Sequence, residues 1–169
     1  CFFLGDLKNF NESYYFSKIN SCWGWATWKE SWEHFDSKMT GYKEMKKNRE
    51  IDKYFEHSEI SNWMISYFDE AYLPSAQTWA QTWSYAIMKN NGLCINPTSH
   101  LVTNIGFTDS PTSDTPEAYS IYSNFKLEQI NHISHPETVS YDVTNDELHF
   151  MNIIKKSDDR LIHSKLELF

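Results

Sequence analysis

Four tryptophans lie within twelve residues of this chain, in the stretch SCWGWATWKESW (residues 21 to 32). They are Trp23, Trp25, Trp28 and Trp32. So dense a group of indoles predicts either a packed aromatic core or a surface that stacks on ligand rings, because indole has a large apolar face and one N–H donor. Aromatic residues make up 17% of the 169 residues, and a chain of this length can bury a core.

The spacing of three of these tryptophans predicts a short helix. Trp25, Trp28 and Trp32 stand at i, i+3 and i+7, which is one stripe of an α-helix. We therefore expect Trp28 and Trp32 to pack in the core. Trp23 and Trp25 flank Gly24 and cannot both face one core, so we expect one of the pair to line a pocket. The glycine between them indicates a close approach to the backbone by a ligand or another strand.

The rest of the chain predicts an α/β fold that is mainly helical with a few short strands. We expect helices over residues 59–72 and 76–91 and from residue 144 onward, strands over 93–96 and 100–107, and a loop over 108–120. Ser58 is the expected N-cap of the first helix and Gly92 the C′ residue of the second. The expected apolar faces consist of Ile60, Trp63, Met64 and Tyr67 in the first helix, and of Trp79, Trp83 and Ile87 in the second.

Charge and composition exclude several classes of function. The net charge of −8 argues against a nucleic-acid or anionic-membrane surface, since either needs a basic field. No apolar run is long enough for a transmembrane segment. Three cysteines without Cys-x-x-Cys spacing predict no disulfide framework and a reducing, cytoplasmic setting. Because the chain begins at Cys1, we expect one domain over residues 1–169 that is a fragment of a longer protein.

No motif in the sequence names a reaction. His132 and His135 stand at i and i+3 without a carboxylate in register, and Asp158-Asp159 is expected on a solvated surface, so we expect no metal in this chain. There is no Gly-rich phosphate loop, no Gly-x-Ser-x-Gly and no Asp-x-Asp. The residues alone therefore predict an acidic, aromatic-rich domain with a surface that suits sugars.

Three stretches together resemble the C-terminal half of a bacterial glycosyltransferase family. They are YYFSKINSCWGWATWKESWEHFD (14–36), TWAQTWSYAIMKNNGLCINP (78–97) and HLVTNIGF (100–107). The family is described as nucleotide-diphospho-sugar transferase, family-2-like or hemolytic-protein-like. The resemblance covers most of residues 14–107. More distantly, the chain is similar to the N-acetylglucosaminyltransferase that starts complex N-glycans.

The resemblance implies the acceptor-side portion of a GT-A-type fold. In that fold an N-terminal Rossmann-like half holds the nucleotide sugar through an acidic, metal-binding motif, and the C-terminal half supplies the acceptor floor, the base and a closing loop. We therefore expect part of an inverting, nucleotide-sugar-dependent glycosyltransferase in surface polysaccharide or glycoconjugate synthesis. Its partners would be a nucleotide sugar and a glycan acceptor. A divalent cation, Mn or Mg, is implied for the full-length enzyme, which we expect in the cytoplasm at the periphery of the inner membrane.

The resemblance also implies the substrate-binding residues, while the catalytic residue stays unassigned. They are Trp23, Gly24, Trp25, Trp79, Asn104, Gly106, Phe107 and Asp109, and we expect the first three to border a cleft that Asn104, Gly106 and Phe107 also reach. Two positions depart from the family. Ala80 stands where relatives often carry the aspartate that would act as base. Residues 108–115 lack the histidine of the relatives' loop, for which Asp109 and Asp114 are candidate substitutes.

Three interpretations stay open at this point. The chain is either part of an enzyme or a non-catalytic carbohydrate- or partner-binding module of the same fold, and the departures at Ala80 and residues 112–115 favour the module. The third reading is a helical scaffold whose aromatic residues are all core.

Overall fold

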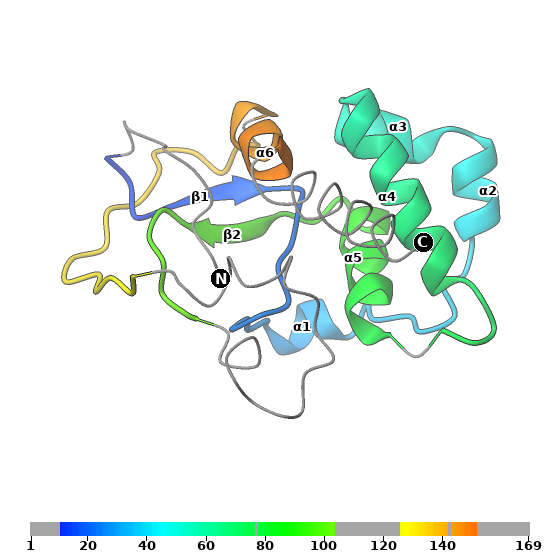
Figure 1. Ribbon diagram of the computed structural model, residues 1–169, viewed down its shortest axis with the longest axis horizontal. Helices are drawn as coiled ribbons and strands as arrows, with labels where there is room; N and C mark the ends of the chain where they lie inside the picture. Colours follow the sequence, from blue (N-terminus) through cyan, green and yellow to red (C-terminus); the bar gives the residue numbers. More distant parts are fainter. Residues whose placement is uncertain (1–10, 77, 104–125, 142, 152–169) are drawn as a thin grey trace, which may run out of the picture. The chain divides into compact units, whose positions relative to one another are not determined.

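The computed structural model describes residues 11–76, 78–103, 126–141 and 143–151 (Figure 1). The chain divides into two compact units, a helical unit of Ser17–Cys94 and a strand unit of Cys1–Phe16 with Ile95–Phe169. The described residues form helices together with a two-stranded sheet, so the prediction of a mixed, mainly helical chain is confirmed at that level.

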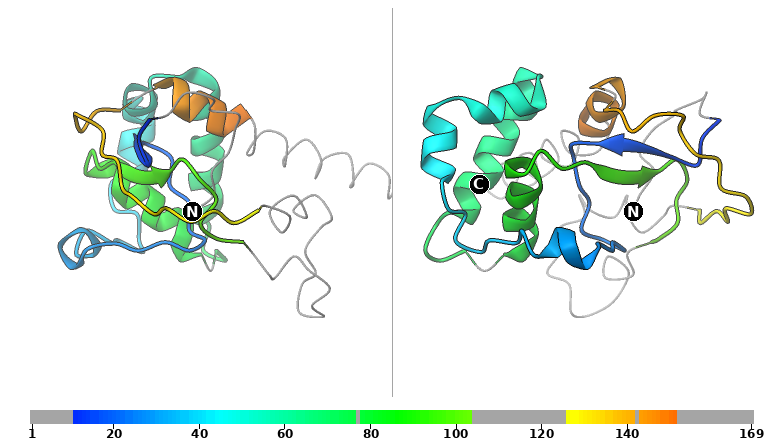
Figure 2. Two further views of the ribbon diagram at one scale, coloured as in Figure 1. Left: turned by 90° about the vertical axis from the view of Figure 1, so that its left-hand side faces the viewer. Right: turned by 180° about the vertical axis from the view of Figure 1, so that it is seen from behind.

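Five helices make up the described helical unit. They are α1 (Lys29–Trp32), α2 (Tyr42–Lys47), α3 (Glu50–Phe55), α4 (Ser58–Ala71) and α5 (Trp79–Lys89). Helix α3 packs against α2 and α4, and α4 packs against α5 (Figure 2). Ile60, Met64 and Phe68 form the buried stripe of α4, because residues four apart lie on one face of a helix. The predicted face was therefore right for Ile60 and Met64, whereas Trp63 and Tyr67 flank the stripe and are part-exposed.

The start of α4 and the end of α5 each differ from the prediction by one residue. His57, not Ser58, is the N-cap of α4, and its Nδ1 accepts a hydrogen bond from the Ile60 amide at 3.4 Å. Asn91, not Gly92, takes the left-handed conformation after α5, with φ of 51°. The Asn91 amide bonds to the Met88 carbonyl and the Gly92 amide to the Ile87 carbonyl, which is the Schellman pattern. Asparagine can fill this position because it tolerates left-handed backbone better than other side chains.

The strand unit contains nearly all of a two-stranded sheet. Strand β1 (Tyr14–Ser17) pairs with β2 (Cys94–Pro97), and helix α6 (Val143–His149) follows later in the chain. The prediction of a strand at 93–96 is thus confirmed to within one residue. Of the second predicted strand, residues 100–103 are not extended into a sheet, and residues 104–107 lie outside the described part.

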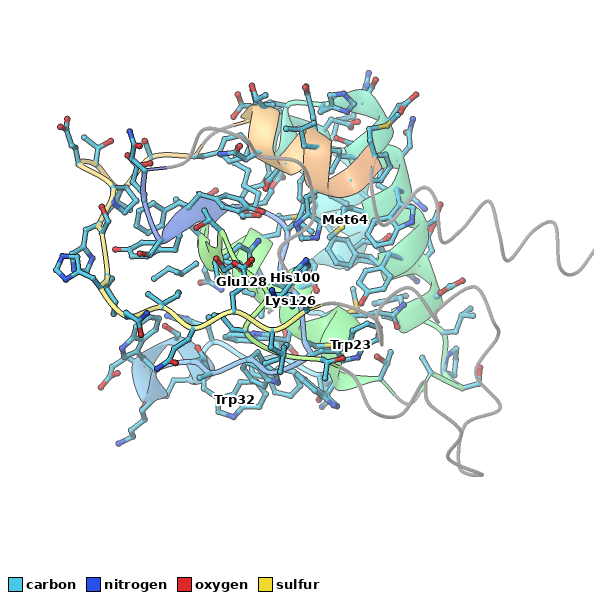
Figure 3. All side chains as sticks on the ribbon, turned by 60° about the vertical axis from the view of Figure 1, so that its left-hand side comes forward. Trp23, Trp32, Met64, His100, Lys126 and Glu128 are labelled. Atoms are coloured by element: carbon cyan, nitrogen blue, oxygen red, sulfur yellow. The ribbon has the colours of Figure 1, made fainter. Side chains whose placement is uncertain are left out.

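Backbone bonds tie the later segment of the strand unit to its start. The Ser13 amide donates to the Ser134 carbonyl at 2.9 Å, and the Thr98 amide donates to the Ser13 carbonyl at 3.0 Å. The Glu128 amide donates to the His100 carbonyl at 2.9 Å, and Figure 3 shows these two residues side by side. Among the described helices, none has the length and apolar content needed to cross a membrane.

Candidate functional site

Five aromatic side chains gather in one cluster of the helical unit. The indole of Trp25 stacks on that of Trp79, with ring centroids 5.1 Å apart and planes 29° apart. Trp32 stacks on Phe35 with centroids 4.5 Å apart and planes 6° apart. Trp83 joins the two pairs, since its centroid lies 5.0 Å from that of Trp32 and 6.2 Å from that of Trp25. We call Trp25, Trp32 and Trp79 the tryptophan platform; Figure 3 labels Trp32.

The tryptophans of this cluster differ in how far they are buried. Trp83 is only 6% exposed, so the prediction that it belongs to the core is confirmed. Trp79 is 45% exposed and Trp32 is 39% exposed, although each stacks on a neighbouring ring. Trp25 is part-buried between them. The platform therefore presents indole to solvent over a buried indole that holds it in place.

Local structure explains how these rings meet. Trp79 and Trp83 lie one turn apart on α5, so both side chains project from the same side of that helix. Trp32 ends α1, and a turn closed by the Phe35 amide on the Trp32 carbonyl at 2.9 Å brings Phe35 under it. Trp25 belongs to the irregular segment before α1 and reaches the cluster from there.

The predicted helical stripe of Trp25, Trp28 and Trp32 is wrong. Helix α1 begins only at Lys29, and Trp28 precedes it in an extended conformation, with φ of −82° and ψ of 152°. Because helical periodicity does not extend back to residue 25, Trp28 does not share a face with Trp32. Trp28 is 66% exposed, so it is not a core residue, and Trp32 belongs to the exposed platform.

The Trp23–Gly24–Trp25 segment turns at its glycine. Gly24 has φ of 61°, a left-handed conformation that favours glycine over any side chain, and this accounts for the residue type. Trp23 and Trp25 are both part-exposed, and Trp25 is the one that joins the platform.

The structure brings together two of the predicted substrate-binding residues, Trp25 and Trp79. Asn104, Gly106, Phe107 and Asp109 lie outside the described residues, as do residues 112–115, so the cleft expected between them and Trp23 stays a prediction. Sequence reasoning missed Phe35 and assigned Trp32 to the core. Phe35 lies beyond the end of α1, so no helical spacing in the sequence indicated its pairing with Trp32.

Asp36, which follows Phe35 in the sequence, is held by several internal partners. Asp36 accepts hydrogen bonds from the amides of Lys38 and Thr40 at 2.9 and 2.8 Å, and its carboxylate lies 3.9 Å from the Lys89 ammonium. Burial acts to raise the pKa of Asp36, but these hydrogen bonds and the lysine outweigh it, so the pKa falls below its ordinary value. Lys89 also donates to the Thr40 carbonyl at 2.7 Å. The ammonium of Lys89 is therefore committed to internal partners.

No carboxylate occupies position 80 of α5, where the resemblance would put a base. Ala80 is part-buried, and its carbonyl accepts a hydrogen bond from Ser84 at 3.0 Å. Within the residues that the structure describes, no group of three or more His, Cys, Asp or Glu side chains could hold a metal ion. Comparison with known protein families, characterised proteins and solved structures finds no match to this chain.

Proposed function

We propose that this chain binds an uncharged glycan on the tryptophan platform, as the acceptor-side part of a nucleotide-sugar-dependent glycosyltransferase. The observation that carries the proposal is the exposure of Trp79, which remains 45% exposed while its ring stacks on Trp25. The resemblance of residues 14–36 and 78–97 to the acceptor half of such enzymes supports the same assignment.

Trp79 leaves apolar surface in contact with water although its ring stacks on that of Trp25. A tryptophan side chain buries up to about 250 Å² when it is fully packed, so leaving nearly half of Trp79 exposed forgoes about 2–3 kcal/mol of burial. Trp83 lies one turn further along α5 in the same aromatic cluster, and it is buried. The apolar face of a sugar ring fits an exposed indole face, and the sugar hydroxyls stay in contact with water.

The charges near the platform favour an uncharged sugar over a phosphate-bearing one. Glu30 and Glu33 are exposed and lie within two positions of Trp32 in the sequence, and Asp36 follows Phe35. Lys29 is the exposed basic residue of α1, while Lys89 is engaged with Asp36. Binding a diphosphate needs cations or directed donors to neutralise its charge. The platform therefore suits the acceptor glycan, and the nucleotide sugar belongs to the upstream half that the resemblance implies.

The residues described here do not fit the divalent cation of such an enzyme, because they contain no cluster of carboxylates, histidines or thiols that could hold it. We assign that cation to the nucleotide-binding half that the resemblance implies. The proposal that the complete enzyme inverts configuration and works on surface polysaccharide rests on the resemblance alone.

A second function is a non-catalytic carbohydrate-binding module of the same origin, and one observation favours it. Ala80 lies next to the platform residue Trp79 and offers no carboxylate to deprotonate an acceptor hydroxyl. Sugar transfer by this chain joined to an upstream nucleotide-binding half would exclude the module, whereas binding without transfer would favour it.

A fluorescence titration tests the proposed binding. The chain is titrated with uncharged oligosaccharides, with matched oligosaccharides that contain uronic acid, and with nucleoside diphosphates, while tryptophan emission is recorded. We expect the uncharged series to change the emission at millimolar concentration and the anionic ligands to change it less. Emission that responds to none of these ligands would contradict the proposal and would favour a helical scaffold.

A further inference from the structure

Ser84 of α5 makes a hydrogen bond that the binding proposal does not use. Its Oγ donates to Oδ1 of Asn20 at 2.6 Å, and Ser84 is buried. Asn20 precedes the Trp23–Gly24–Trp25 segment by three residues. The contact joins positions 64 residues apart in the sequence, so it fixes tertiary structure and not a local turn.

The segment from Asn20 to Trp25 is attached to α5 at two levels. Asn20 contacts Ser84 near the middle of the helix, and Trp25 contacts Trp83 and Trp79 toward its first residue. The segment therefore runs along α5 in the direction opposite to the helix. Gly24 allows the left-handed turn that brings the Trp25 ring into contact with the Trp79 ring.

Further polar contacts surround the Ser84 attachment. Burial raises the pKa of Tyr67 on α4 to about 12, with a smaller raising effect from Cys22, while a hydrogen bond involving Ser84 acts to lower it. Ser84 thus lies where α4, α5 and the segment before the tryptophans meet.

From this geometry we infer that Ser84 is a positioning residue for the tryptophan platform. Its bond to Asn20 fixes the position of the Trp23–Gly24–Trp25 segment along the axis of α5. The Trp25 ring is thereby placed on the Trp79 ring. The inference concerns how the platform is built, and its consequence for glycan affinity rests on the proposed function.

Circular dichroism reports this arrangement without any ligand. Indoles that lie about 5 Å apart couple and give a pair of bands of opposite sign in the far ultraviolet, and Trp25 lies 5.1 Å from Trp79. The Trp25→Ala variant defines how much of the signal depends on Trp25. We expect Ser84→Ala to move the spectrum toward that of Trp25→Ala and to weaken glycan binding about fivefold, the equivalent of about 1 kcal/mol.

Two control variants isolate the bond to Asn20. The single hydroxyl proton of Ser84 can go either to Asn20 or to the carbonyl of Ala80, which lies four residues earlier and 3.0 Å away. Ser66 of α4 makes a bond of the second type, to the carbonyl of Asn62 at 3.2 Å. Ser66→Ala removes only a bond of that local type, so we expect it to leave the spectrum unchanged. Asn20→Asp keeps an oxygen acceptor for the Ser84 hydroxyl, and we expect it to retain the wild-type spectrum.

The outcomes separate this inference from the proposed function. A Ser84→Ala protein with the wild-type spectrum and affinity would overturn the inference. If the wild-type chain binds no glycan, the proposed function fails, and the spectra still decide the role of Ser84. Where Ser84→Ala does not fold, Asn20→Ala breaks the same bond from the part-exposed side, and the same spectral change is expected of it.

Discussion

The hydroxyl oxygen of Tyr15 lies 3.4 Å from Nδ1 of His149, and both side chains are buried. The contact joins β1 to α6 across 134 residues of sequence. Burial raises the pKa of Tyr15 above its ordinary value, and the negative charge of Asp146, also on α6, raises it further. Burial lowers the pKa of His149 to about 4. Tyr15 and His149 are therefore both neutral at physiological pH.

Acid should destabilise the chain through His149. The unfolded imidazole has a pKa of about 6.5 and the folded one of about 4, so the unfolded state binds the extra proton between these values. Stability is then complete above about pH 6.5 and declines as the pH falls toward 4, by roughly 3 kcal/mol at most. Denaturant unfolding of the wild type and of His149→Gln at several pH values measures this decline.

The difference between these two proteins carries the result, because other groups titrate in the same range. We expect His149→Gln to be less sensitive to acid than the wild type over this window. His34→Gln, at an exposed position of the helical unit, should behave like the wild type. Equal acid sensitivity of wild type and His149→Gln would contradict the assignment.

Trp83 and Trp28 should differ sharply in their contribution to stability. Trp83 is buried beneath the platform, and its truncation to alanine should lower the free energy of unfolding by roughly 3–5 kcal/mol, because it leaves a cavity among packed rings. Trp28 is largely exposed, so Trp28→Ala should change it by less than about 0.5 kcal/mol. Urea unfolding curves test this pair, and similar losses for both variants would be inconsistent with the burial described.

The residue after α5 offers a test of backbone conformation. Asn91 has φ of 51°, so Asn91→Ala should lower the free energy of unfolding by about 1 kcal/mol. The reason is that left-handed backbone is less favourable for alanine than for asparagine. Asn91→Gly should match or exceed wild-type stability. The melting temperatures of the two variants measure the effect. An alanine variant as stable as the glycine variant would mean that residue 91 is not left-handed.

The sequence predicted those features that depend on local pattern. The apolar spacing of residues 60, 64 and 83 correctly marked buried positions on α4 and α5, and the short apolar run before Pro97 correctly marked β2. The Trp25, Trp28 and Trp32 spacing failed because helical periodicity has meaning only inside a helix, and α1 begins after Trp28.

The site itself was predicted only in part. Trp25 and Trp79 were both named, but their contact joins segments 54 positions apart, and nothing in the spacing of either segment specifies it. The Ser84–Asn20 bond is non-local in the same way. Residue propensity predicted Ser58 as the N-cap of α4, but the imidazole nitrogen of His57 can also accept an amide hydrogen bond and does so here.

The affinity of the platform for an uncharged oligosaccharide, compared between Trp79→Ala and Trp28→Ala, tests the central claim most directly. Both variants remove one exposed indole, but only Trp79 belongs to the platform. Titrations followed through the indole N–H signals in nuclear magnetic resonance spectra give the affinities. We predict a dissociation constant in the millimolar range for the wild type, corresponding to about 4 kcal/mol, with Trp28→Ala unchanged and Trp79→Ala at least about tenfold weaker. Equal affinities for the two variants, or a loss confined to Trp28→Ala, would contradict the claim that the platform binds the sugar.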